Sequence, residues 1–349
     1  MTDLVNYLSD KIAEIFFKKL LPKKIAVAVS GGADSLALTL LLHDFCLANK
    51  IKLFAITIDH KMRKSSSQEA LELNKILSKK KIPHKILAIP TKKIPQKNIE
   101  AKLREMRYEL LCEFCKKNKI EYLFLGHHLG DVAENFLIRL FRGSGLDGLS
   151  TMAEISEFNN IKLVRPLLNV EKEQLKNFLR SKKVKWFEDE TNDDEKFLRN
   201  KIRKFFDSFE EKDLIEKRIK NASDEIAKMR DFFDKIMLDE AKKILTLQPN
   251  GNFLIHHKKF QKLDEKIALK ILALVLMEVG GKDYKPRLEK LKNFYQYLRS
   301  DEIKPRNFYG CMAKKFDANS LIIFKENHRI MLRCSQSEIK LRTILKKIF

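Results

Sequence analysis

The sequence predicts an α/β fold, with a Rossmann-like, doubly wound parallel sheet, a helical linker and a smaller α+β C-terminal domain. Three observations lead to this prediction. Short apolar runs rich in β-branched residues alternate with longer helical patterns as far as residue 205. The chain is then charged and amphipathic to residue 247, where a QPNG turn begins a mixed segment. With 349 residues, the chain is also too long for one ordinary domain.

Five short apolar runs are expected to form buried parallel strands, at residues 24–29, 53–58, 82–89, 121–125 and 161–164. Apolar residues at helical spacing predict helices at residues 4–21, 36–47, 66–80, 100–117 and 131–141. Pro22 should end the first helix and Gly143 the last. Ligands bind beyond the carboxyl ends of strands in such sheets, so the loops after the first, second and fourth runs should share one rim.

The remainder of the chain is read as a linker and a second domain. Residues 206–247 are expected to form the helical linker, between a first domain at 1–205 and a last one at 248–349. In the last domain, we expect helices at 266–279 and 286–298 and a strand at 320–324.

The charge balance points to a polyanionic partner. Seventy Lys and Arg against 47 Asp and Glu give a net charge of +23. Residues 241–349 carry +14 of it and residues 1–240 only +9, so the last part of the chain is the most basic. A uniform compositional bias would not concentrate the excess in this way, which favours nucleic acid as the partner.

Composition also excludes several classes of protein. Hydrophobic residues make up 44%, which excludes a mainly disordered chain, and no apolar run is long enough for a membrane span. The start of the chain lacks the layout of a secretory signal, and five cysteines without framework spacing argue against a disulfide scaffold. We therefore expect a cytoplasmic protein.

The segment from Ser30 to Ser35, with the sequence SGGADS, lies between an expected strand and helix. Gly31 and Gly32 allow a tight turn close to a phosphate, and N–H groups at the helix start bind anions. Ala33 continues the loop, and the two serines add hydroxyl donors. Asp34 suits an anion site only with a metal between, so we expect it to meet Mg²⁺ held by a nucleotide.

This motif resembles the SGGxDS signature of the PP-loop ATP pyrophosphatases, which cleave ATP between the α and β phosphates. Further motifs resemble the tRNA(Ile)-lysidine synthetases, in order and over residues 24–205. They include Asp59-His60, Arg104 with Arg107-Tyr108, Gly126-His127-His128 with Asp131 and Glu134, Arg142 to Gly145, Arg165 to Leu168, Trp186, and Arg199-Asn200 with Arg203. Lys61, Met62, Leu103 and Asn135 depart from the family pattern without removing a charged group.

The resemblance implies an AMP-forming ligase that joins free lysine to C2 of the wobble cytidine in a CAU-anticodon isoleucine tRNA. ATP and Mg²⁺ are the implied cofactors, and a homodimer is suggested by the resemblance alone. The expected ATP-binding residues are Ser30, Gly31, Gly32, Ala33, Asp34, Ser35, Asp59, His60, Arg104 and His127. The expected catalytic residues are Asp34, Arg107, Asp131 and Glu134, the lysine-binding residues are Asp131, Glu134 and Arg199, and the tRNA-binding residues are Lys201, Arg203 and Lys204.

Elementary chemistry agrees with these roles. A guanidinium such as that of Arg107 can grip the charge that builds on a phosphate. Asp131 and Glu134 lie three residues apart at a helix start and so share one face, where they can hold an ammonium group or accept its proton. A solvated pair of acids that complements the helix dipole is the simpler interpretation of these two residues alone.

Two other functions stay open at this point. Cys112 and Cys115 form a C-x-x-C pair, which favours a PP-loop tRNA thiolase with an iron–sulfur cluster. Their position in an apolar-faced helix favours simple packing instead. A non-catalytic RNA-binding protein is the third hypothesis, and the intact set of Asp34, Arg107 and Asp131 argues against it.

Overall fold

The structure is a computed structural model that describes residues 2–17, 20–59, 64–89, 99–150, 152–188, 198–282 and 284–326. The chain divides into two compact units, residues 1–228 and residues 229–349. Each unit has its own sheet and its own buried core.

The first unit contains a six-stranded sheet in the order β3-β2-β1-β4-β6-β5. Its strands are β1 (Lys24–Ala28), β2 (Lys52–Asp59), β3 (His84–Ala88), β4 (Tyr122–Leu125), β5 (Ile155–Phe158) and β6 (Ile161–Val164). All neighbouring pairs are parallel except β5 with β6. The predicted doubly wound parallel sheet is therefore confirmed, with one antiparallel strand added at its edge.

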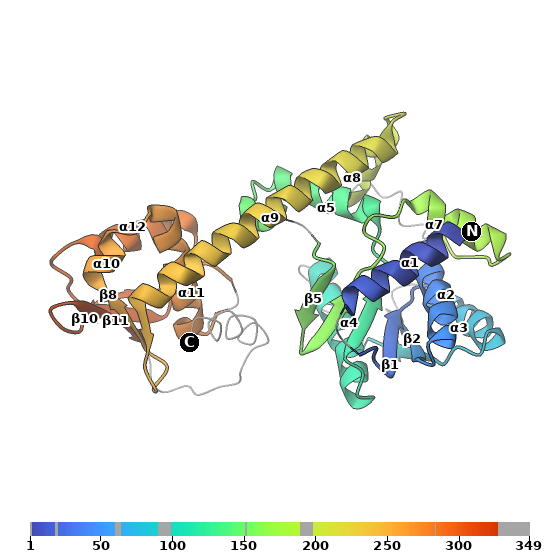
Figure 1. Cartoon of the computed structure of the whole chain (residues 1–349), viewed down its shortest axis with the longest axis horizontal. Coiled ribbons are helices and arrows are strands. Elements are labelled where there is room, and N and C mark those ends of the chain that lie inside the picture. The colour runs from blue at the N-terminus through green and yellow to red at the C-terminus, as the bar shows by residue number, and fades with distance from the viewer. Residues whose placement is uncertain are drawn as a thin grey trace. The chain divides into compact units, whose positions relative to one another are not determined.

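Helices and strands alternate along the chain from the first helix to the fifth, and Figure 1 shows the helices of this unit around its strands. They are α1 (Thr2–Ile15), α2 (Ala33–Ala48), α3 (Lys64–Lys79), α4 (Ile99–Lys117), α5 (Leu129–Phe141), α6 (Leu146–Leu149), α7 (Lys172–Ser181), α8 (Leu198–Asp207) and α9 (Lys212–Ile244). The expectation that the first helix runs to residue 21 is wrong, because α1 ends at Ile15, well before Pro22. Apolar residues continue past its end, so hydrophobic spacing alone places the end too late.

The central strand β1 shows why the sheet is apolar throughout. Ile25 and Val27 are buried in a core shared with α1, α2 and α7, whereas Ala26 and Ala28 are buried in a core shared with α4. Since both faces are covered by helices, every residue of the strand beyond Lys24 is apolar.

The second unit has a five-stranded antiparallel sheet in the order β7-β8-β11-β10-β9. Its strands are β7 (Leu245–Leu247), β8 (Phe253–His256), β9 (Arg306–Phe308), β10 (Cys311–Lys315) and β11 (Ser320–Lys325), with helices α10 (His257–Gln261), α11 (Glu265–Gly280) and α12 (Leu288–Arg299). The expected α+β character is confirmed. The helix α9 occupies most of the expected linker at 206–247, and the boundaries at 205 and 248 stay a proposal.

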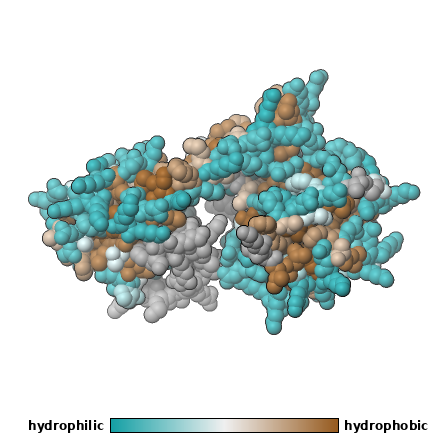
Figure 2. Space-filling view, viewed as in Figure 1, coloured by the Kyte–Doolittle hydropathy of each residue, from teal (hydrophilic) through white to brown (hydrophobic). Residues whose placement is uncertain are grey.

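The surface carries the polar residues that the composition requires. Figure 2 shows hydrophilic residues over much of the visible face of each unit, with apolar patches between them. Among the described helices, none is both long and apolar enough to cross a membrane.

Candidate active site

The loop of residues 29–32 connects β1 to α2 at the carboxyl end of the sheet, and together with the start of α2, as far as Ser35, it is here called the PP-loop after the signature that its motif resembles. Gly31 has φ +91°, and a Cβ added there would lie 2.6 Å from the Phe187 ring, so only glycine fits. The Ser30 N–H donates to Ser35 Oγ at 3.0 Å, and the Ser35 hydroxyl donates to the Gly32 carbonyl at 3.2 Å. No side chain caps the start of α2, which leaves the N–H groups of its first turn for an anion.

Asp34 lies in the first turn of α2 and has an oxygen without a protein partner. Its Oδ1 is buried and makes no hydrogen bond among the described residues, whereas Oδ2 lies 3.7 Å from His128 Nε2. Burial raises the pKa of the Asp34 carboxyl, although His128 and Lys172 act in the opposite direction. An orphaned carboxylate oxygen beside a phosphate-type loop fits a hard cation such as Mg²⁺.

His128 joins the PP-loop to the start of α5. It is the N-cap of this helix, and its Nδ1 accepts a hydrogen bond from the Gly130 N–H at 3.1 Å. Nδ1 therefore carries no hydrogen, and the neutral ring carries its hydrogen on Nε2. Nε2 lies 3.7 Å from Asp34 Oδ2 and also 3.7 Å from Asp131 Oδ2, so one imidazole lies between the two expected acids.

Asp131 is the second residue of the capping box at the start of α5. Its Oδ2 accepts from the backbone N–H of His128 at 3.1 Å. Burial acts to raise the pKa of Asp131, but the nearby His128 and His127 and this N–H outweigh it and lower the pKa from its usual value. Asp131 is therefore a carboxylate at neutral pH.

Glu134 lies one turn further along α5 and is engaged by two arginines of α8. Arg203 Nε donates to Glu134 Oε1 at 2.6 Å, and Arg199 Nε lies 3.2 Å from Oε2 without the alignment of a hydrogen bond. Burial raises the pKa of Glu134, and Arg203 partly offsets this shift. Arg203 was expected with the tRNA-binding residues, which stays a prediction, and the structure places it against Glu134, an expected lysine-binding residue.

His127 follows β4, and the charges of several arginines act on it. Burial lowers its pKa to about 3, and Asp131 acts in the opposite direction. The positive charges of Arg165, Arg104 and Arg107 add to the lowering. His127 is thus a neutral imidazole at physiological pH. Its Nδ1 and the Nε of Arg165 are buried without a partner among the described residues, which leaves two polar atoms for a ligand.

Two charged residues near the site were missed by the sequence reasoning. Glu216 of α9 is 5% exposed, and its Oε1 lies 3.3 Å from where a Cβ on Gly130 would be. Lys172 begins α7 and acts electrostatically on Asp34. Glu216 stands in a charged helix that reads as solvated, so no sequence signal could have found it. Lys172 follows a predicted strand at the ligand-binding rim, and that position was an available signal.

None of the contacts in this group involves the remaining expected residues. Asp59 is buried at the end of β2, and His60 lies outside the described residues. Lys201 and Lys204 are exposed on α8. Cys112 and Cys115 are free and fully buried, and burial raises each thiol pKa to about 12, which confirms the packing interpretation. Within the described ranges, no cluster of His, Cys, Asp and Glu could by itself hold a metal ion.

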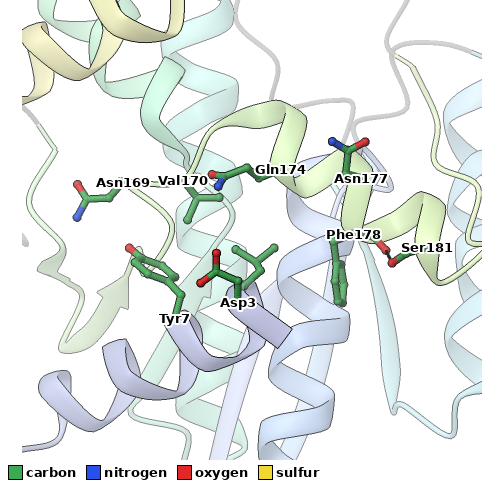
Figure 3. A pocket seen from close by; sticks show the side chains of 9 residues that line it. Asp3, Tyr7, Asn169, Val170, Gln174, Asn177, Phe178 and Ser181 are labelled. Carbon is green, nitrogen blue, oxygen red and sulfur yellow. Dashed lines mark hydrogen bonds between the residues drawn. The ribbon is translucent and has the colours of Figure 1, made fainter. Parts of the chain in front are cut away.

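A separate cavity of about 430 Å³ lies between α1 and α7. Figure 3 shows Asp3 and Tyr7 from α1 on one side of it and Gln174 from α7 on the other. Its lining includes none of the residues expected in the site.

Comparisons with known proteins show the family to which this chain belongs. A model of the PP-loop domain matches residues 6–207. The tRNA(Ile)-lysidine synthase of Wolbachia pipientis wMel is 33% identical over 88% of this chain and 72% of its own length. The synthase of Rickettsia typhi is 31% identical over 87% of this chain and 70% of its own length.

A solved structure shows the same fold at greater distance. The U34-tRNA thiolase of Methanococcus maripaludis aligns with a TM-score of 0.50 at 17% identity, over 63% of this chain and 80% of that chain. This likeness supports the fold and not a shared reaction. With the match over residues 6–207 and the synthases at 33% and 31% identity, the chain belongs to the PP-loop domain family and, within it, to the tRNA(Ile)-lysidine synthases.

Proposed function

We propose that this enzyme ligates free lysine to C2 of the wobble cytidine in a CAU-anticodon isoleucine tRNA. The C2 oxygen of the base attacks the α-phosphorus of ATP, and pyrophosphate leaves. The lysine side-chain amine then attacks C2, and AMP leaves. The overall products are lysidine, AMP and pyrophosphate, so the enzyme is an AMP-forming carbon–nitrogen ligase.

The ATP half of the proposed site is built on the PP-loop. The first turn of α2 and the hydroxyls of Ser30 and Ser35 would bind phosphate oxygens. Asp34 would hold Mg²⁺ by its orphaned oxygen, and the bound ion would neutralise phosphate charge. Arg107 and Arg104, whose charges act on the neutral His127, would stabilise charge on the α-phosphate.

The lysine half is built on α5 and α8. Asp131, Glu134, Arg199 and Arg203 would receive an amino acid whose side chain is an ammonium group. Because Glu134 already pairs with two guanidiniums, Asp131 is the acid best placed for the ammonium group. Arg199, which makes no aligned hydrogen bond to Glu134, would turn to the lysine carboxylate.

The tRNA would be held by phosphate contacts that make binding depend on salt. Lys201 and Lys204 are exposed on α8, next to the lysine half, and the excess of +14 over residues 241–349 supplies further cations. The wobble base must leave its stack to reach the α-phosphate. We place the reaction in the cytoplasm, where its substrates are, and the homodimer stays a prediction.

One observation carries this proposal: His128 Nε2 lies 3.7 Å from an acid of the PP-loop and 3.7 Å from an acid of α5. This closeness supports one continuous site for the nucleotide and the amine, as a reaction through an adenylated base requires.

The experiment is product analysis with purified enzyme, ATP, Mg²⁺, lysine and unmodified isoleucine tRNA. Lysidine in the digested tRNA, with AMP and pyrophosphate in equal amounts, supports the ligase. A thiolated nucleoside, bound iron, or loss of turnover in Cys112→Ala would support a thiolase instead. We expect Cys112→Ala to keep its activity because the thiol is buried in the core and donates only to the Phe158 carbonyl among the contacts of the described residues.

A further inference from the structure

Cleavage of ATP into AMP and pyrophosphate requires cations on the leaving side. As oxygen bonds to the α-phosphorus, the bond from phosphorus to the bridging oxygen breaks, and its electron pair leaves with pyrophosphate. Residues 30–35 offer N–H groups and hydroxyls but contain no lysine or arginine. Arg104 and Arg107 belong to α4, and their charges act on His127, which follows β4. A side-chain cation next to the PP-loop would therefore neutralise the charge that develops on the leaving pyrophosphate.

Lys172 has this position. It is the first residue of α7, which packs against α2, the helix that starts in the PP-loop. The segment before it is anchored to α5, because the Leu129 N–H donates to the Val170 carbonyl at 3.0 Å. The neighbouring His128 ring lies 3.7 Å from Asp34, which brings the start of α7 to the rim of the loop. The charge of Lys172 acts on Asp34 accordingly.

The Lys172 ammonium is exposed, and the acids beside it are engaged by other cations. Glu171 pairs with Lys217 at 2.5 Å, and Glu173 pairs with Arg180 at 2.5 Å. Within the described ranges, no ion pair involves Lys172. The side chain is thus available to an anionic ligand at the PP-loop.

We propose that Lys172 binds the β- and γ-phosphates of ATP and the pyrophosphate released from them. The inference deepens the proposed function and rests on its cleavage of ATP. An ammonium group on a flexible stem suits the terminal phosphates, which differ in position between ATP and free pyrophosphate. The first turn of α7 adds the positive end of a helix dipole on the same side.

The test is calorimetric titration of the full chain with Mg²⁺-pyrophosphate and, separately, with AMP. Lys172→Ala should weaken the affinity for pyrophosphate about tenfold and leave that for AMP within about twofold. Lys172→Arg should retain most of the affinity. The matched control is Lys176→Ala, one turn along the same helix, where the ammonium lies 4.0 Å from Glu188. It should bind pyrophosphate as the parent does.

Unchanged pyrophosphate affinity in Lys172→Ala, or an equal loss for AMP, would overturn the inference. Thermal unfolding checks that each variant is folded, and Lys172→Gln replaces the alanine variant if that one is not. The titrations contain neither tRNA nor lysine. If Lys172→Ala loses pyrophosphate affinity as expected but the parent chain transfers no lysine to tRNA, the proposed function is refuted and the role of Lys172 in pyrophosphate binding is retained.

Discussion

His128 Nε2 lies 3.7 Å from Asp34 Oδ2, so the N-cap of α5 directly faces the first turn of α2. The same ring accepts the Gly130 N–H at Nδ1. His128 therefore has two separable tasks, one for the stability of α5 and one for the position of Asp34.

Two variants at this position separate these tasks. Asparagine is a good N-cap, so His128→Asn should keep the thermal midpoint near that of the parent, whereas His128→Ala should cost about 1 kcal/mol. Both lose the Nε2 hydrogen, and both should reduce lysine transfer at least about tenfold. Parent-like turnover in His128→Asn would show that the link between His128 and Asp34 is not used.

Gly130 should not tolerate a side chain. A Cβ there would lie 2.9 Å from His128 Cε1 and 3.3 Å from Glu216 Oε1, so Gly130→Ala must displace the histidine ring. We expect a loss of about 1–3 kcal/mol in urea unfolding, together with reduced turnover. Gly145→Ala is the control, because nothing lies within 4 Å of a Cβ at Gly145. Equal effects of the two variants would contradict the packing described around His128.

Glu216 should make stability depend on pH. Burial raises its pKa above the ordinary value of 4.5, and Lys212 partly opposes this. The folded chain then binds more protons at Glu216 than the unfolded chain, so this contribution to the free energy of unfolding falls as pH rises above 4.5. As the pH rises from 5 to 8, which is roughly the range above the ordinary pKa of 4.5, Glu216→Gln should become more stable relative to the parent.

Urea unfolding across this range measures the difference. Glu173→Gln controls for the loss of a surface acid, because the Glu173 side chain is 57% exposed. A Glu216→Gln variant that loses stability relative to the parent as pH rises would reverse the sign of the expected effect.

The ion pair of Glu134 and Arg203 should matter more than surface pairs do. Glu134 is 6% exposed, so Arg203→Gln leaves a buried carboxylate short of a partner and should cost about 1–3 kcal/mol. The KM for lysine should rise as well. Arg180→Gln breaks a 2.5 Å pair whose two side chains are more than half exposed, and it should cost below about 1 kcal/mol. If Arg203→Gln and Arg180→Gln lose similar amounts of unfolding free energy, Glu134 is more hydrated than the structure shows and the prediction is wrong.

Much of the fold could be predicted because its strands are written as short apolar runs. β1 and β4 are buried on both faces, so their residues are nearly all apolar. β5, β9 and β10 could not be found in this way, since they are short, partly polar and defined by antiparallel partners. Pairing between strands is a tertiary interaction that local periodicity does not contain.

Part of the candidate site was predictable because two sequence motifs contain its acidic residues. Asp34, Asp131 and Glu134 were expected, and the structure brings all three into one group. Arg203 and Glu216 behave differently, because a charged residue in an amphipathic helix reads as solvated until the packing of that helix is known. Arg203 and Glu216 could be assigned to the site only because the structure shows that they lie on the faces of α8 and α9 that contact α5.

The most direct test of the central claim is incorporation of labelled lysine into an unmodified isoleucine tRNA transcript with a CAU anticodon. The methionine tRNA with the same anticodon is the control, and ATP and Mg²⁺ are present. We predict labelling of the isoleucine tRNA alone, dependent on ATP, and its loss in Asp131→Asn. No labelling of the isoleucine tRNA, with ATP still split to AMP and pyrophosphate in the presence of another RNA, would contradict lysidine synthesis by this chain.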